Sequence, residues 1–247
     1  MSDVTDRPTV AVFRPDDERS EAAASLLAEL GAEPLADPML AVRPTGARPR
    51  TDADYAALTS KTGAELAAEA GWEAGNATLC AIGDRTATAL REAGYAVDVV
   101  PETYSSAGLV EALGDRVAGA RVEVARSDHG SDVLLTGLRE AGAYVHETVL
   151  YRLVRPQGAG DAAEAAAAGE LDAALFTSSL TVEHFLAAAG TRGVREAALE
   201  GLDGAVVGAI GAPTAETARA RGVAVEVVPE TADFESLARA AVRALRD

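Results

Sequence analysis

The chain has 247 residues, with 39 Asp or Glu against 22 Lys or Arg, so its formal net charge at pH 7 is −17. With 48% hydrophobic and 25% charged residues, the composition is that of a globular protein and excludes wholesale disorder. The acidity excludes general nucleic-acid binding, because contacts to phosphates need clustered Lys and Arg. The length is enough for one large domain or two modest ones.

The sequence carries no membrane, secretion or disulfide signal. No run approaches the roughly 18 apolar residues of a membrane span, and the first residues lack a signal peptide's hydrophobic stretch. Cys80 is the single cysteine, so it can form neither an internal disulfide nor a zinc cluster. We expect a cytoplasmic protein with no membrane partner.

Five short apolar segments, taken in chain order, have the pattern of buried strands. Each runs into a polar or Gly-containing turn, and helical spacing of leucines and alanines follows. The five segments are Val10–Phe13, Thr78–Ile82, Val122–Ala125, Ala173–Phe176 and Ala205–Ile210. Strands that alternate with helices at this spacing indicate parallel sheets covered on both faces, which is the α/β class.

The predicted helices have recognisable ends. Ser20 or Asp17 can cap the first helix, and Gly31 suits the left-handed position after its last turn. Pro213 falls where the first turn of its helix begins, a position that needs no N–H. The Ala-rich run Asp161–Ala168 is a helix candidate because Ala is the best helix former.

Two extended segments interrupt this rhythm. Pro38–Pro44 and Thr148–Pro156 are β-prone, each ends in Arg-Pro, and neither leads directly into a helix. Two matched segments of this kind predict a paired connection between lobes.

An internal repeat organises the chain. Residues 81–103 and 209–231, displaced by 209 − 81 = 128 positions, are identical at 14 of 23 places. A weaker echo relates 55–60 to 173–178, with the helices that follow predicted to stop at Gly71 and Gly190; another relates 10–14 to 122–126. The chain therefore arose by duplication, and the repeat alone would divide it into consecutive halves near residue 118.

The familiar catalytic motifs are missing from the sequence. It has no Walker A loop, no Gly-x-Ser-x-Gly elbow, no His-Glu-x-x-His and no Gly-rich dinucleotide fingerprint. The histidines His129, His146 and His184 lack metal-ligand spacing, which favours structural or exposed roles. Cys80 falls within a predicted strand and is expected to be an inert core residue.

Small hydroxyl residues gather at the predicted strand-to-helix turns. The turns contain Thr59-Ser60, Gly83–Thr86, Ser127–Gly130, Thr177–Ser179 and Gly211–Thr214. In parallel sheets such turns lie at the carboxyl ends of the strands, where helix amides and hydroxyls favour anions. Plain helix capping explains the same residues equally well, and both interpretations stay open at this point.

Tyr151 and two arginines are further candidates. Tyr151 lies in the second extended segment, and its phenol can donate a proton or hydrogen-bond a developing charge. Packing between lobes is the alternative role for Tyr151. Arg14 and Arg126 end equivalent strands, where each can pair with a ligand carboxylate or with a neighbouring acid.

At these residues the sequence resembles the uroporphyrinogen-III synthase family of tetrapyrrole biosynthesis, over essentially the whole chain. Arg14-Pro15 resembles the family's opening Thr-Arg-Pro, with Phe13 in place of the threonine. The segments 176–182 (FTSSLTV) and 209–215 (AIGAPTA) resemble its Phe-Thr-Ser and Ile-Gly-x-x-Thr-Ala motifs. Tyr151 occupies the place of the family's connector tyrosine.

The resemblance implies two α/β lobes, each a parallel sheet flanked by helices, joined by a two-stranded β-ladder with the active site in the cleft between them. It makes the first lobe discontinuous, about residues 1–38 plus 157–247, and the second about 45–147. Residues 39–44 and 148–156 become the connecting strands. This replaces the consecutive halves that the repeat alone suggests.

The resemblance also implies a cofactor-free, metal-free lyase reaction, a step of porphyrin and heme biosynthesis. Hydroxymethylbilane, a linear tetrapyrrole with eight carboxylates, loses its terminal hydroxyl as water, ring D is inverted, and the macrocycle closes to uroporphyrinogen III. By correspondence Tyr151 assists departure of the hydroxyl. The residues expected to bind the substrate are Arg14, Ser60, Thr86, Ser127, Ser178, Ser179, Gly211 and Thr214.

Two non-enzymatic alternatives remain: a two-lobed receptor for a small anionic ligand, and a regulatory module that kept the fold and lost the activity. Tyr151 in its connector favours the enzyme. We expect a monomer whose partner is its small-molecule substrate. The scattered acids, with Lys61 the one lysine, indicate a halophilic protein, although an arginine-biased lineage gives part of the same pattern.

Overall fold

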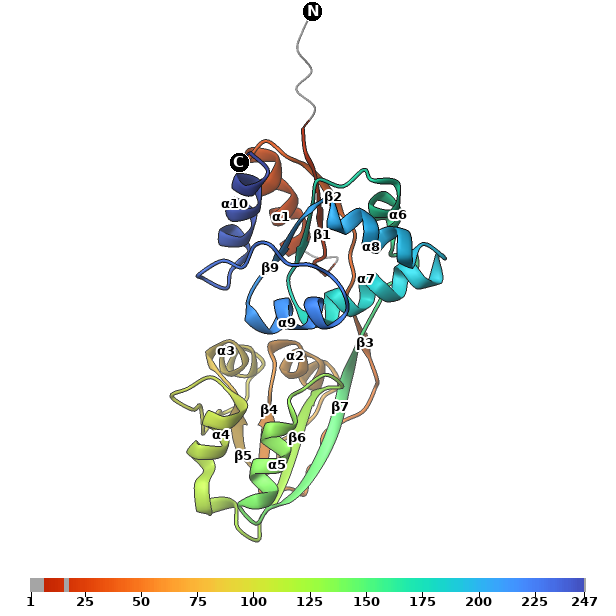
Figure 1. The fold of residues 1–247 in the computed structure, drawn as a ribbon. Helices are drawn as coiled ribbons and strands as arrows, with labels where there is room; N and C mark the ends of the chain where they lie inside the picture. The colour runs from red at the N-terminus through yellow and green to blue at the C-terminus, as the bar shows by residue number, and fades with distance from the viewer. Residues whose placement is uncertain (1–6, 16–17, 247) are drawn as a thin grey trace, which may run out of the picture. The chain divides into compact units, whose positions relative to one another are not determined.

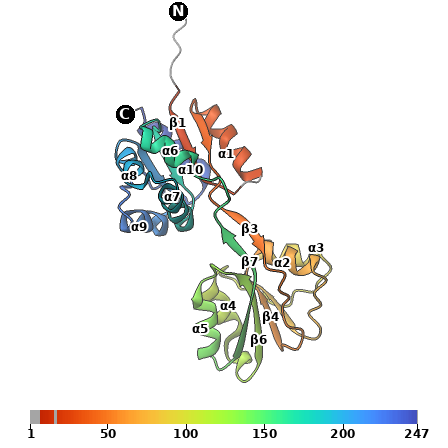
Figure 2. The ribbon, with the colours of Figure 1, turned by 90° about the vertical axis from the view of Figure 1, so that its right-hand side faces the viewer.

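The chain folds into two compact units, each a β-sheet between two layers of helices (Figures 1 and 2). The computed structural model describes residues 7–15 and 18–246. Unit 1 comprises Met1–Ala41 and Val154–Asp247, and unit 2 comprises Val42–Leu153. The strand pairs β1–β2, β1–β8, β8–β9, β4–β5, β4–β6 and β6–β7 are parallel, which confirms the predicted α/β class.

Unit 1 has a four-stranded sheet in the order β2-β1-β8-β9. Its strands are β1 (Thr9–Val12), β2 (Glu33–Ala36), β8 (Ala173–Phe176) and β9 (Val206–Ala209). Its helices are α1 (Glu18–Glu29), α6 (Asp161–Ala168), α7 (Ser179–Thr191), α8 (Arg195–Asp203), α9 (Ala212–Ala220) and α10 (Phe234–Ala244).

Alternation along the strands of unit 1 gives two cores. Val10 and Val12 pack with α1 and α10, whereas Ala11 and Phe13 pack in a second cluster with α6, α7 and α8. In that second cluster the ring of Phe13 stacks on that of Phe176 with centroids 4.7 Å apart. The sheet is therefore buried on both faces, as parallel sheets require.

Unit 2 has a five-stranded sheet in the order β3-β7-β6-β4-β5. Its strands are β3 (Ala41–Pro44), β4 (Tyr55–Leu58), β5 (Thr78–Ala81), β6 (Arg121–Ser127) and β7 (Tyr144–Val154). Its helices are α2 (Lys61–Glu69), α3 (Asp84–Glu92), α4 (Ser106–Leu113), the 3₁₀ turn η1 (Gly114–Val117) and α5 (Asp132–Glu140). Helices α2 and α3 cover one face, and α4 and α5 cover the other (Figure 2).

The sequence repeat is also a structural repeat. Adding 128 to the bounds of β5 and α3 gives the bounds of β9 and α9, and the starts of α4 and α10 differ by the same 128. The isolated bridges Cys80–Val99 and Gly208–Val227 are related in the same way. Each unit therefore holds one copy of the repeated segment, with its hydrogen bonds in the same register.

Two helix boundaries differ from the sequence prediction. Helix α7 runs through Gly190 and ends at Thr191, with the left-handed glycine at Gly193 (φ 72°). The prediction of a stop at Gly190 was wrong because a helix tolerates a glycine at an exposed position such as this one at a modest cost. Ser20 lies inside α1 and does not cap it, and Asp17 lies outside the described residues.

The first extended segment contains β3 and the second contains residues 148–154 of β7, and the two strands are neighbours in the sheet. The Thr45 amide donates to the Leu150 carbonyl at 2.9 Å. β7 begins at Tyr144, four residues before the predicted segment. The described helices include none with the length and apolar character that a bilayer crossing requires.

An aspartate joins the starts of neighbouring strands in each unit. Asp172 Oδ2 accepts the Thr9 amide at 2.7 Å, and Asp54 Oδ2 accepts the Arg121 amide at 2.8 Å. The Arg121 guanidinium also pairs with Asp54, at 3.2 Å. Both contacts hold the first residues of the parallel pairs β1–β8 and β4–β6 in register.

Two glycine substitutions test the helix packing. A Cβ on Gly201 of α8 would lie 1.8 Å from the Ala166 carbonyl oxygen of α6, whereas a Cβ on Gly190 meets no atom within 4 Å. We expect Gly201→Ala to lower the free energy of unfolding by about 3 kcal/mol. Gly190→Ala should raise it by roughly 0.5–1 kcal/mol, because helix propensity alone changes there. Urea unfolding of both variants checks this, and equal effects would contradict the packing.

Acidification tests the aspartate contact of unit 2. Hydrogen bonds from the Arg121 side chain and amide lower the pKa of Asp54. A lowered folded-state pKa stabilises above the unfolded value of about 3.9 and is lost as pH falls through the folded value. Near neutral pH the wild-type protein should unfold at a higher urea midpoint than Asp54→Asn. This difference between the two midpoints should shrink below about pH 4. A difference that does not change with pH would contradict this.

Candidate active site

Polar side chains from three turns of unit 2 meet in a hollow at the carboxyl ends of its strands. The cavity has a volume of about 170 Å³. Its lining includes Ser60, Ser106, Arg126, Ser127, Ser131 and Tyr151. The structure thus brings together three of the predicted residues, Ser60, Ser127 and Tyr151.

Tyr151 is buried and is hydrogen-bonded inside this hollow. Its hydroxyl donates to Ser60 Oγ at 3.0 Å, and Ser60 Oγ also accepts the Gly63 amide at 3.0 Å as the N-cap of α2. Since both contacts use Ser60 as an acceptor, its own hydroxyl proton is available to a further acceptor. Gly63 allows this close packing, because a Cβ there would lie 3.0 Å from Ser60 Oγ.

A β-bulge sets the orientation of Tyr151. Arg126 pairs with Val149, and the next residue of β6, Ser127, pairs with Tyr151, so Leu150 is the extra residue. Leu150 and Tyr151 consequently pack in the same core cluster, although successive residues of a regular strand point to opposite faces. The bulge turns the tyrosine into the hollow.

Arg126 is held by acids of its own unit. Its Nε donates to Glu147 at 2.6 Å, Nη1 to the Ser131 carbonyl at 2.7 Å and Nη2 to Asp132 at 3.2 Å. Gly130 lies against the guanidinium, since a Cβ there would be 2.8 Å from Nη1. Of the two roles open to Arg126 in the sequence, the structure shows pairing with neighbouring acids.

Thr86 lies in the first turn of α3, outside the lining of the hollow. It is buried, and the helix starts at Gly83. In the part of the chain that the structure describes, no side chain caps the first amides of α3. The Tyr104 ring packs on Gly83, and its hydroxyl donates to Asp84. This turn therefore presents backbone amides beside an aromatic ring.

The predicted residues of unit 1 also lie at the carboxyl ends of strands. Thr214 is buried in the first turn of α9, which starts at Gly211, again with no side-chain cap among the described residues. Ser178 caps α7 in a capping box with Thr181. Ser179 Oγ donates to the Pro213 carbonyl at 3.2 Å.

Arg14 follows β1 at the same edge of its sheet. Its guanidinium carbon lies 5.0 Å from the centroid of the Phe234 ring, a cation–π distance. Among the predicted residues of unit 1, Ser178 and Ser179 already make hydrogen bonds within their own unit, whereas the turn at Gly211 offers backbone amides.

The residues expected to be inert have structural partners. His184 Nδ1 lies 2.5 Å from the Met39 carbonyl oxygen, and His129 and His146 each contact one carboxylate. Burial raises the pKa of the Cys80 thiol to about 12, so the thiol stays protonated. Among residues 7–15 and 18–246, no three His, Cys, Asp or Glu side chains are grouped to hold a metal ion.

Sequence reasoning missed Ser106 and Ser131, which line the hollow from α4 and the start of α5. The repeat carried a signal for the first, because Ser105 and Asp233 cap equivalent helices at the same offset of 128. Ser131 stands four residues after Ser127 and caps α5, but no motif marks it.

A family model, curated relatives and solved structures all match this chain to the same family. The family model described as Uroporphyrinogen-III synthase HemD matches residues 21–239. A protein of Methanothermobacter thermautotrophicus, with the provisional name uroporphyrinogen-III synthase, is 34% identical over 237 residues, covering 90% of this chain and 92% of its own.

Solved structures share the fold. A mutant uroporphyrinogen III synthase from the extremely thermophilic bacterium Thermus thermophilus matches with a TM-score of 0.64 and 24% identity, over 97% of this chain and 99% of its own. The synthetase of Helicobacter pylori 26695 matches with a TM-score of 0.63 and 16% identity, over 96% and 99%. With a family match over most of its length and a 34% identical relative, the chain belongs to the uroporphyrinogen-III synthase family.

Proposed function

We propose that this chain closes hydroxymethylbilane to uroporphyrinogen III, with loss of water and inversion of ring D. The observation that carries the proposal is the buried Tyr151–Ser60 hydrogen bond in the hollow of unit 2, in a member of this family. Neither residue needs a cofactor or metal to transfer a proton.

Tyr151 and Ser60 act together in departure of the hydroxyl. The C–O bond of the hydroxymethyl group breaks as its oxygen takes a proton and leaves as water. The Tyr151 phenol supplies that proton directly or through Ser60. The Ser60 hydroxyl is suited to the relay because its oxygen accepts from Tyr151 and its own proton can be donated to another acceptor.

The substrate carboxylates are held by helix N-termini and hydroxyls at the carboxyl ends of the strands. The amides that follow Gly83 and Gly211 lack side-chain caps among the described residues, and Thr86 and Thr214 stand in those first turns. Ser127 contributes from β6, and Ser178, Ser179 and Arg14 from unit 1.

The assignment of lobes and partners follows the family. Residues 1–38 with 157–247 form one lobe, 45–147 the other, and 39–44 with 148–156 the connecting strands. We further propose a cytoplasmic monomer that binds neither nucleic acid nor membranes. The charge of −17, scattered over the chain, supports adaptation to a salty cytoplasm.

The reaction is tested by its product. Hydroxymethylbilane is generated in situ, the protein is added at a salt concentration that keeps it folded, and the oxidised uroporphyrin isomers are separated. The type III isomer is expected. Type I alone would show that the protein is not a synthase, and binding without turnover would favour the receptor.

Tyr151→Phe tests the acid. We expect turnover to fall by about 100-fold, because the proton donor is lost. The free energy of unfolding should fall by only about 1 kcal/mol, which is the contribution of one neutral hydrogen bond. Tyr55→Phe is the matched control, since the Tyr55 hydroxyl binds the Arg116 carbonyl away from the hollow. Equal turnover of Tyr151→Phe and wild type would remove the catalytic role.

Salt tests the meaning of the acidity. A protein of charge −17 repels a polyanionic substrate at low salt. At about 1 M salt the Debye length is about 3 Å, so repulsion beyond contact range is screened. We expect the KM to fall as salt rises from about 0.1 to about 1 M. Activity that collapses on adding salt would overturn the halophilic interpretation.

A further inference from the structure

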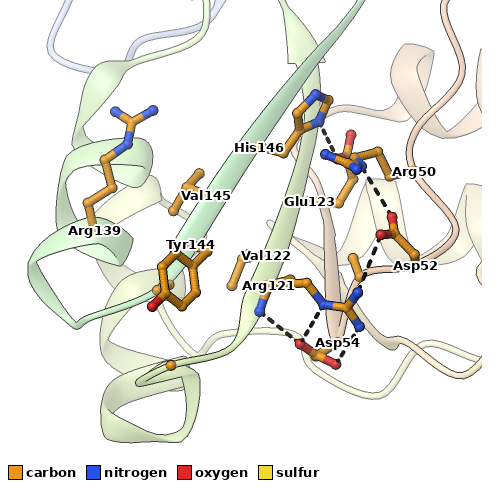
Figure 3. Close-up of a pocket in the computed structure, with 13 residues that line it drawn as sticks. Arg50, Asp52, Asp54, Arg121, Val122, Glu123, Arg139, Tyr144, Val145 and His146 are labelled. Atoms are coloured by element: carbon orange, nitrogen blue, oxygen red, sulfur yellow. Dashed lines mark hydrogen bonds and ion pairs between the residues drawn. The ribbon is translucent and has the colours of Figure 1, made fainter.

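A second, larger hollow lies at the opposite end of the unit 2 sheet. It has a volume of about 770 Å³ and opens at the amino ends of β6 and β7 (Figure 3). Six residues of strand separate Arg121 from Ser127, which is about 20 Å along β6. This hollow is therefore separate from the one that holds Tyr151.

The strand register places polar side chains together in this hollow. Arg121 pairs with Tyr144, and Glu123 pairs with His146, so the four residues share one face of the sheet. Parallel sheets normally bury apolar residues on both faces. Arg121 is explained by its pairing with Asp54 and Asp52, and Tyr144 is exposed, so Glu123 and His146 are the polar residues that packing does not explain.

Glu123 is the unusual group. Its side chain is 0% exposed, and Oε2 lies 2.6 Å from Nδ1 of the half-exposed His146. Within the described residues, Oε1 is buried and has no hydrogen-bond partner. A buried carboxylate oxygen without a donor is costly, so this position favours a ligand that brings an N–H.

Arg50 supplies a complementary donor. Its Nε donates to Asp52 at 3.1 Å. Within the described residues its two terminal nitrogens make no hydrogen bond, so they are open to a ligand. Arg50, Glu123 and His146 all line this hollow, and in the view of Figure 3 the Arg50 guanidinium overlaps the Glu123 carboxylate. Two parallel N–H groups of a guanidinium match a carboxylate. Tyr144, 72% exposed, adds an aromatic surface at the rim.

We propose that this hollow binds small organic acids that carry an N–H donor beside the carboxylate. The carboxylate pairs with Arg50, and the N–H donates to Glu123 Oε1. Pyrrole acids and free amino acids share this chemistry. Pyrroles are flat, and their nitrogen donates a hydrogen bond without accepting one. The preference for pyrroles over amino acids rests on the proposed function, but the proposal of a binding site does not rest on it.

The test compares two flat acids that differ in one group. Pyrrole-2-carboxylate carries the N–H, and furan-2-carboxylate has an oxygen in its place. Each is titrated into ¹⁵N-labelled full-length protein, and amide shifts are followed by NMR. We expect pyrrole-2-carboxylate to bind with a dissociation constant on the order of 1 mM, with shifts at Glu123, Tyr144 and His146. The furan should bind about tenfold more weakly.

Glycine and glutamate form the amino-acid arm. Binding at the same residues more tightly than the pyrrole would support the site and identify amino acids as its ligands. Arg50→Ala and Glu123→Gln should each weaken binding of the better ligand about tenfold, and Arg91→Ala, an exposed arginine of α3 outside the hollow, is the matched control. The spectrum of each free variant establishes that it is folded.

Three results would overturn the proposal: equal binding of pyrrole and furan acids, no shifts at this hollow with any probe, or binding unaffected by Arg50→Ala. The outcome is independent of catalysis. A protein that makes no type III isomer can still bind here, and an active synthase can fail to bind.

Discussion

Parallel pairing of the central strands, β1 with β8 and β6 with β4, is the constraint on which both units depend. Parallel neighbours need crossover connections, so a turn and a helix follow β1, β4, β5, β6, β8 and β9. All such turns of one sheet consequently lie along the same edge. Asp172 and Asp54 fix the register at the other edge, by accepting the first amides of the neighbouring strands.

The duplicated turns have acquired two kinds of chemistry. Ser60 and Ser178 cap their helices, so their oxygens accept amides of their own unit. Gly83 and Gly211 are the N-caps of equivalent helices, with extended backbone and without a side-chain cap among the described residues. Of the two interpretations that compete in the sequence, capping is confirmed at Ser60 and Ser178, and anion binding stays a prediction for the turns at Gly83 and Gly211. Ser60 has a second contact, because its oxygen also accepts the Tyr151 hydroxyl.

Local pattern predicted much of this fold, and long-range contacts account for what it missed. Five strands (β1, β5, β6, β8 and β9), the α/β class and the 128-residue offset follow from periodicity and repetition, which a single sequence displays, whereas β2 and β4 were not among the predicted strands. The bulge at Leu150 was not predictable, because it depends on the register of β7 against β6. The pairing of Arg126 with Glu147 was not predictable either, because the two residues lie on neighbouring strands, β6 and β7. Burial of Glu123 was hidden for the same reason, since RVEV reads equally well as a half-exposed strand.

Charge acts at two ranges in unit 2. Arg126 is neutralised by Glu147 and Asp132, and Arg121 by Asp54 and Asp52, so these arginines add little net attraction for an anion. Their ion pairs instead hold the two ends of β6 in place. Arg121 is the first residue of this strand, and Arg126 is next to its last residue. Binding of an anion at the carboxyl edge must then come from amides and hydroxyls at contact distance, which salt screens far less than it screens the net charge of −17. An acidic protein can thus bind a polyanion where its surface charge is screened and its turns offer amides and hydroxyls at contact distance.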